Sequence, residues 1–140
     1  MIKSINMNNT KNYIIEKAAR AKDASKKLGL VPTVVKNLAL LKIAENILKN
    51  SDRIISENLK DIKNAQKQKL SSALIDRLKL NEKRLVSMTD GLKQIAELPD
   101  PVGEVIGKIK RPNGLKIEKI RVPLGVIGII YESRPNVTVD

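Results

Sequence analysis

Apolar residues recur every three or four positions from about Thr10 to Leu98, a spacing that places them on one face of an α-helix. Breaks in the pattern divide this stretch into five predicted helices. The predicted N-caps all carry a side-chain oxygen: Thr33, Ser51, Ser71 and Asn81. Gly29 is expected to end the first helix in a left-handed conformation. Pro99 is expected to end the fifth.

Each predicted helix carries one apolar stripe, which indicates that it lies on a hydrophobic core. The five stripes are Ile14, Ala18, Ala21 and Ala24; Leu38, Leu41, Ala44 and Leu48; Ile55, Leu59 and Ile62; Ala73, Leu74 and Leu78; and Leu85, Met88, Leu92 and Ile95. The first stripe consists mostly of alanine, which favours close packing against another element. The segment 1–12 is polar, and we expect it to be a tail outside the fold.

The pattern changes after Pro99-Asp100-Pro101, where apolar residues begin to alternate with polar ones. This alternation predicts two strands, Val105–Ile109 and Leu115–Val122. Asn113-Gly114 between them predicts a hairpin turn, because both residues tolerate a positive φ. The step of three between Ile117 and Ile120 predicts a β-bulge near Glu118-Lys119.

The run Leu124–Tyr131 is apolar at nearly every position, which is typical of a strand buried inside a parallel sheet. A parallel partner requires a crossover of at least about a dozen residues. Only nine residues follow Tyr131. We therefore predict an α/β fold of which this chain supplies the helices, a hairpin and the first strand of a Rossmann-like parallel sheet. The alternative is that the strand pairs in trans with another chain.

Composition removes several kinds of chemistry. The 140 residues include no Cys and no His, which excludes thiolate nucleophiles, Ser-His-Asp triads and Cys or His metal sites. The net charge of +12 favours nucleic-acid binding, but the lysines are spread over all helices and aromatic residues are nearly absent. No apolar run of signal-peptide or membrane-spanning length is found, so we expect a cytoplasmic protein that binds neither nucleic acid nor membrane.

The loop after the predicted buried strand is the candidate ligand site, because open α/β sheets bind ligands beyond the carboxyl ends of their strands. It offers a guanidinium in Arg134, a hydroxyl in Ser133 and an amide in Asn136, which suit a phosphorylated or carboxylated ligand. The alternative is structural. Arg134 then pairs with Glu132 or Asp140, and Asn136 caps a helix that starts near Val137.

The stretch from Arg121 to Asp140, with Tyr-Glu-Ser-Arg-Pro-Asn-Val-Thr at 131–138, closely resembles the gamma-glutamyl phosphate reductase family. This family is also called glutamate-5-semialdehyde dehydrogenase and belongs to the aldehyde dehydrogenase superfamily. Residues 18–28, 72–80 and 100–103 resemble the same family in the same order. The resemblance covers nearly the whole chain beyond its polar tail, and it implies the N-terminal portion of such an enzyme.

The resemblance implies an oxidoreductase of proline biosynthesis that reduces L-glutamyl 5-phosphate with NADPH to L-glutamate 5-semialdehyde and phosphate. The family's nucleophilic Cys would lie downstream, so we expect no catalytic residue here and no activity from this portion alone. Arg134 or Asn136 would contact the substrate or its oxyanion. The cofactor contacts would lie at Tyr131, Glu132 and Ser133.

The same resemblance assigns roles to the segments of the chain. Residues 13–98 would be the helical part of the cofactor-binding domain, 102–122 an oligomerisation hairpin, and 123–140 the first strand and ligand loop. A homo-oligomer and a contact with glutamate 5-kinase are the expected associations. Two alternatives stay open at this point: a basic helical module that binds nucleic acid or protein, and a split subunit that acts in trans.

Overall fold

A computed structural model describes residues 7–139 and forms two compact units. The hairpin unit comprises the chain up to Val31 together with Asp100–Gly128, and the helical unit comprises Pro32–Pro99 together with the chain from Ile129 onward. The elements are α1 (Met7–Leu28), α2 (Thr33–Lys49), α3 (Ser51–Lys67), α4 (Ser72–Leu78), α5 (Glu82–Glu97), β1 (Val105–Lys110), β2 (Lys116–Ile120) and the 3₁₀ turn η1 (Pro135–Thr138). The five predicted helices and the hairpin are therefore confirmed.

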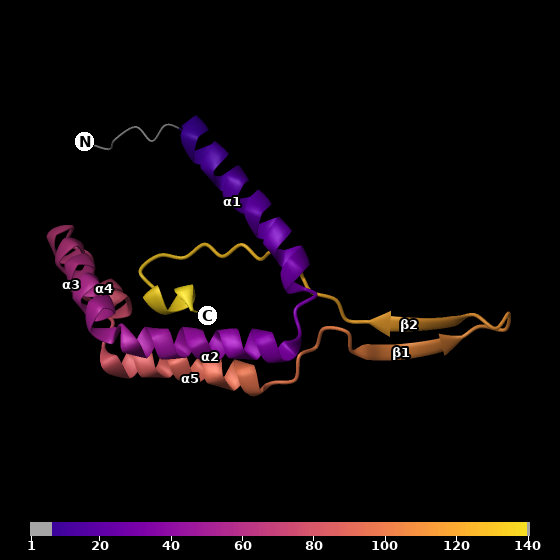
Figure 1. The fold of residues 1–140 in the computed structure, drawn as a ribbon. Coiled ribbons are helices and arrows are strands. Elements are labelled where there is room, and N and C mark those ends of the chain that lie inside the picture. The colour runs from indigo at the N-terminus through magenta and orange to yellow at the C-terminus, as the bar shows by residue number, and fades with distance from the viewer. Residues whose placement is uncertain (1–6, 140) are drawn as a thin grey trace. The chain divides into compact units, whose positions relative to one another are not determined.

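In the helical unit, α2 lies alongside α5, and α4 packs on α3 (Figure 1). The buried apolar side chains are Ala44, Ala65, Leu80, Leu85, Leu92 and Ala96. The buried face of α5 is rotated from the predicted stripe, because Thr89 is buried while Ile95 is exposed. Burial of Thr89 costs little, because its hydroxyl donates a 2.8 Å hydrogen bond to the carbonyl of Val86. The side-chain amide of Asn37 joins α2 to α5 by a 2.6 Å bond to the carbonyl of Ala96.

Two of the predicted N-caps are confirmed. The Ser71 hydroxyl accepts from the N–H of Leu74, and the Asn81 amide oxygen accepts from the N–H of Arg84 at 2.8 Å. The other two predictions are wrong by one residue, because Thr33 and Ser51 are the first residues of their helices. Pro32 occupies the cap position of α2 with an extended backbone. Asn50 precedes α3, and its side chain instead donates to the carbonyl of Asn46 at the end of α2.

The hairpin unit contains α1, β1 and β2. Helix α1 begins at Met7, inside the segment predicted to be a tail, because each added helical residue gains one backbone hydrogen bond once a helix exists. It ends at Leu28 as predicted, but the following Gly29 does not have a positive φ. The absence of a side chain matters there for another reason. A β-carbon on Gly29 would lie only 3.3 Å from Cγ of Pro123.

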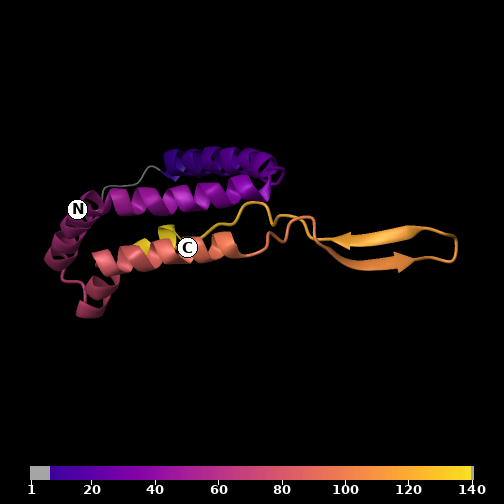
Figure 2. The ribbon, with the colours of Figure 1, turned by 60° about the horizontal axis from the view of Figure 1, so that its bottom comes forward.

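Strands β1 and β2 run antiparallel, as the two arrows in Figure 2 show. Ile109 lies opposite Ile117. The predicted bulge exists but lies on the other strand, since the extra residue falls between Val105 and Gly107 of β1. A bulge shifts the pairing of both strands, so the apolar pattern of β2 alone cannot show which strand holds the extra residue.

The hairpin turn is closed by a hydrogen bond from the Gly114 N–H to the Arg111 carbonyl at 2.9 Å. Only Gly114 has a positive φ, of 88°, and Asn113 does not. Pro112 explains the difference, because its fixed φ starts an ordinary turn and leaves the left-handed position to the glycine.

The segment 121–131 has no regular secondary structure. The predicted parallel strand is therefore not formed within residues 7–139, where β1 and β2 are the strands. Its apolar side chains remain largely exposed, including Leu124, Ile127 and Ile130. Strand geometry needs a hydrogen-bonded neighbour, and the described chain offers none in parallel orientation. Within residues 7–139, no helix is long and apolar enough to span a membrane.

Candidate functional site

A cavity of about 580 Å³ lies within the helical unit. Its walls come from α4 and the residues after it, from α5, and from the loop that contains η1. The lining residues are Asp76, Arg77, Lys79 and Leu80; Arg84, Ser87 and Met88; and Arg134, Pro135 and Asn136. The volume falls in the range of about 300–1,000 Å³ that is typical of small-molecule sites.

The two residues predicted to contact the substrate, Arg134 and Asn136, both line this cavity. Arg134 stands at the N-cap position of η1, and its side chain makes no capping hydrogen bond. Asn136 lies inside η1, so the alternative in which Asn136 caps a helix is wrong. The described residues contain no ion pair between Arg134 and Glu132, and Asp140 lies outside the described residues.

The three predicted cofactor residues are not among those that line this cavity. The hydroxyl of Tyr131 is hydrogen-bonded to that of Thr138 at 2.8 Å, which closes the loop over η1. Ser133 has a φ of 53°, a left-handed conformation that a non-glycine residue adopts at a cost. Glu132 is exposed. The loop is therefore tightly turned between Tyr131 and Thr138, and its turn directs Arg134 and Asn136 to the cavity.

Arg84 holds the two helical walls together. Its guanidinium donates hydrogen bonds to the backbone carbonyls of Asp76 and Lys79 and lies 3.1 Å from the Asp76 carboxylate. The carbonyls at the end of a helix have no partners inside the helix, so a guanidinium is well suited to them. Arg84 therefore fixes the end of α4 against the start of α5.

Asn58 fixes the same connection from the other side. This side chain is buried, donates to the carbonyl of Leu78 at 2.9 Å and accepts from the N–H of Leu80 at 2.7 Å. Sequence reasoning missed Asn58 on α3, Arg84 on α5 and the residues of the cavity that lie on or directly after α4. Their partners lie in other elements or arise from packing, and periodicity does not report such contacts.

The cavity is positively charged. Arg77, Lys79 and Arg134 make no ion pair with any described residue, whereas Arg84 is paired with Asp76, the acidic residue on the lining. No group of acidic residues within residues 7–139 is arranged to hold a metal ion. The lining carries no cysteine and no histidine. The arrangement can therefore bind and orient an anionic ligand, and a thiol or an imidazole would have to come from elsewhere.

Comparison with known proteins identifies the relatives of this chain. The chain matches no protein-family model. It is 58% identical over 127 residues to the gamma-glutamyl phosphate reductase of Carboxydothermus hydrogenoformans, a match that covers 91% of this chain and 31% of that protein. This chain is homologous to gamma-glutamyl phosphate reductases. The reductase of Clostridium novyi is 54% identical over 132 residues, covering 94% of this chain and 32% of that protein.

Solved reductase structures agree with this relationship. The gamma-glutamyl phosphate reductase of Thermotoga maritima superposes with a TM-score of 0.86 at 44% identity, covering 89% of this chain and 30% of that one. The reductase of Saccharomyces cerevisiae gives a TM-score of 0.79 at 31% identity, covering 87% and 31%. The chain thus spans about 31% of the length of the curated reductases it matches, at their N-terminal end. The resemblance identified from the sequence is confirmed, and so is the mixed helix-and-hairpin fold.

Proposed function

We propose that this chain is the N-terminal part of an enzyme that reduces L-glutamyl 5-phosphate with NADPH to L-glutamate 5-semialdehyde and inorganic phosphate. The observation that carries the proposal is 58% identity to a gamma-glutamyl phosphate reductase over 91% of the chain. The cationic cavity supports it, because a phosphorylated substrate requires such a site. We propose that the complete enzyme is located in the cytoplasm. Its substrate would be supplied there by glutamate 5-kinase.

In this proposal, Arg134 binds the phosphate of the substrate. A guanidinium offers two parallel donors to a phosphate and keeps its charge at all accessible pH values. The same contact stabilises the negative charge on the phosphate as it leaves. Asn136 lines the same cavity and can donate an amide N–H to the carbonyl oxygen as that oxygen gains charge. The nucleophilic thiolate belongs to another part of the enzyme, since this chain has no cysteine.

The residues proposed to contact the cofactor fit its hydroxyl groups better than its phosphates. Glu132 is an acceptor with a negative charge, and Ser133 offers a hydroxyl, so both suit ribose hydroxyls. When bound, NADPH supplies the hydride that reduces the acyl group. The contribution of this chain is to bind and orient, and this portion alone is proposed to be inactive.

Steady-state kinetics of the complete enzyme test the proposal. Removal of one stabilising donor typically lowers kcat by about 10²–10³-fold. We expect Arg134→Ala to produce a loss of that order and Arg134→Lys to restore part of it, because lysine keeps the charge without the planar fork. Arg20→Ala, at an exposed position of α1 and not on the cavity lining, is the matched control. Normal turnover by Arg134→Ala with a loss in Asn136→Ala would move the stabilising role to Asn136. Normal turnover by both would remove this loop from the site.

We also propose that the hairpin joins two copies of the complete enzyme. Its strands pair only with each other among the described residues, and both faces expose apolar side chains, including Ile106, Ile109 and Ile117. Exposed strand edges are templates for further pairing. Ile117→Pro should weaken assembly more than it weakens folding of one subunit. Sedimentation velocity would show the smaller species, and an unchanged profile would contradict the proposal.

A further inference from the structure

The cationic groups of the cavity fall into two sets. Arg134 comes from the loop at η1, whereas Arg77 and Lys79 come from the end of α4. None of the three forms an ion pair with a described residue. Cations that share a cavity repel one another, and an anionic ligand relieves that repulsion. Because the two sets come from different elements, a ligand with two anionic groups can engage both.

We infer that Arg77 and Lys79 bind the α-carboxylate of the substrate, at the end of the molecule opposite the phosphate held by Arg134. This inference rests on the proposed function, because L-glutamyl 5-phosphate carries both anionic groups on one chain. The Asp76 carboxylate on the same lining pairs with Arg84 and has further lone pairs that can accept from the α-ammonium group of the substrate. Arg77 and Lys79 therefore determine specificity for an amino-acid substrate.

The backbone that carries these residues is held in place before any ligand arrives. Arg84 binds the carbonyl of Lys79, while Asn58 binds the carbonyl of Leu78 and the N–H of Leu80. Three consecutive residues are thus fixed by side chains from two other helices. A site whose backbone is already ordered pays less entropy when it binds, which strengthens a charge-assisted contact. Arg84 is a positioning residue in this arrangement, because its guanidinium is already occupied by the end of α4.

NADPH is the other source of anionic groups in the reaction, so the experiment must separate substrate from cofactor. The reverse reaction of the complete enzyme does so, because L-glutamate 5-semialdehyde, inorganic phosphate and NADP⁺ can be varied one at a time. The carboxylate is then on the semialdehyde and the phosphate is a separate ligand. The variants are Arg77→Gln and Lys79→Gln, with Lys83→Gln on α5, outside the cavity, as the matched control.

We expect each variant to raise the KM for L-glutamate 5-semialdehyde by roughly 10-fold or more, as for the loss of a hydrogen bond between charged groups. The KM values for phosphate and NADP⁺ should stay near those of the wild type. Pentanal has no carboxylate, so the preference for the semialdehyde over pentanal, measured as a ratio of kcat/KM values, should fall by a similar factor. Arg77→Lys should recover part of the loss, and melting temperatures show whether each variant is folded.

Three results would overturn the inference. A rise confined to the KM for NADP⁺ would assign Arg77 and Lys79 to the cofactor, and a rise confined to phosphate would assign them to the phosphate site. Unchanged kinetics in both variants would remove α4 from the ligand site. Failure of the proposed function gives a different result, because the wild-type enzyme would then not oxidise the semialdehyde at all.

Discussion

Similar apolar side chains are buried in the helical unit and exposed in the hairpin unit. Leu85 of α5 is 1% exposed, whereas Ile109 of β1 is 55% exposed. Both residues sit in regular elements with the periodicity expected of those elements. Periodicity therefore reports which face is apolar, but it does not report whether that face has something to cover it. In the helical unit the apolar faces of the helices pack against one another, whereas among the described residues nothing packs against the apolar faces of the hairpin.

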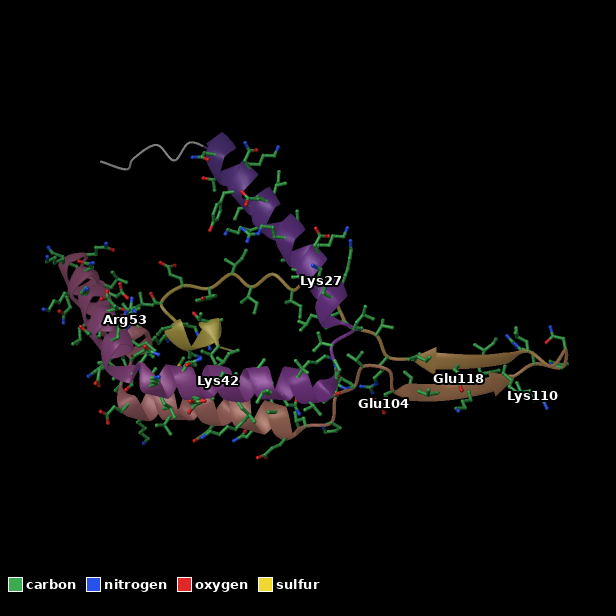
Figure 3. The ribbon with its side chains drawn as sticks, in the orientation of Figure 1. Lys27, Lys42, Arg53, Glu104, Lys110 and Glu118 are labelled. Carbon is green, nitrogen blue, oxygen red and sulfur yellow. The ribbon has the colours of Figure 1, made fainter. Side chains whose placement is uncertain are left out.

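The polar contacts of the two units differ in the same way. In the helical unit, the side chains of Asn37 and Asn58 bind backbone groups far away in the sequence. The hairpin is crossed by a 2.9 Å ion pair between Lys108 and Glu118, and Figure 3 shows Glu118 among the side chains that stand off the strands. Exposed ion pairs contribute little to stability.

Truncation of an apolar side chain should separate the two units most clearly. We expect Leu85→Ala to lower the free energy of unfolding by about 2–5 kcal/mol, because it leaves a cavity in a packed core. Ile109→Ala should change it by no more than about 0.5 kcal/mol, since the side chain is largely in water. Urea unfolding followed by helical circular dichroism measures both. Equal losses would show that the hairpin is covered in the 140-residue chain.

Loss of a buried polar contact should have the next largest effect. Asn58→Ala leaves the Leu78 carbonyl and the Leu80 N–H without their partner, which should cost about 1–3 kcal/mol. Asn64→Ala, at an exposed position on the same helix, is the control and should be nearly neutral. Amide hydrogen exchange at Leu80 measures the local effect. Unchanged protection of that amide in Asn58→Ala would contradict the fixed α4–α5 connection.

Replacement of glycine by alanine should change stability in opposite directions in the two units. Gly114 has a φ of 88°, so Gly114→Ala should destabilise the hairpin turn by about 1–2 kcal/mol. Gly91 lies in α5 with no atom within 4 Å of an added β-carbon, so Gly91→Ala should stabilise by about 0.4–1 kcal/mol. Exchange of the Arg111 amide reports the turn, and thermal unfolding reports α5. A shift of the same sign at both sites would be the contrary result.

The smallest expected effect concerns pH. A hydrogen bond from the Lys60 ammonium, at 2.6 Å, and the charges of Lys60 and Arg53 hold the pKa of Glu57 below its ordinary value of 4.5. The contribution of Glu57 to stability is therefore complete above pH 4.5 and is lost as the pH falls through the lowered pKa. Lys60→Met should raise the pKa of Glu57 toward 4.5, and Lys63→Met should not. Titration of the Glu57 carboxyl carbon by NMR would show either outcome.

Features of the fold that depend on residues close together in the chain could be predicted from the sequence. The caps at Ser71 and Asn81 were predicted because each bonds a backbone amide three residues ahead. Arg134 and Asn136 were predicted because they follow the apolar run, and the structure brings both to one cavity. The predicted cofactor role of Tyr131, Glu132 and Ser133 stays a prediction.

The remaining features depend on contacts that no local pattern encodes. Thr89 is buried on α5 in place of a predicted apolar residue because its hydroxyl finds a partner inside its own helix. Arg77 lies in the last turn of α4 and Lys79 directly after it, and in the sequence both positions are typical of a solvated surface. Their place beside Arg134 arises only when the chain from Ile129 onward packs into the helical unit.

The fixed backbone around Lys79 has a consequence for how such a site can change over evolutionary time. Its two neighbours and its own carbonyl are held by Asn58 and Arg84, so the position of the main chain does not depend on the Lys79 side chain. A substitution there alters the charge of the cavity and leaves its walls in place. Substitutions at this one position can therefore change the ligand preference of the cavity with little effect on folding. Lys79 is a suitable first target for directed evolution of that preference.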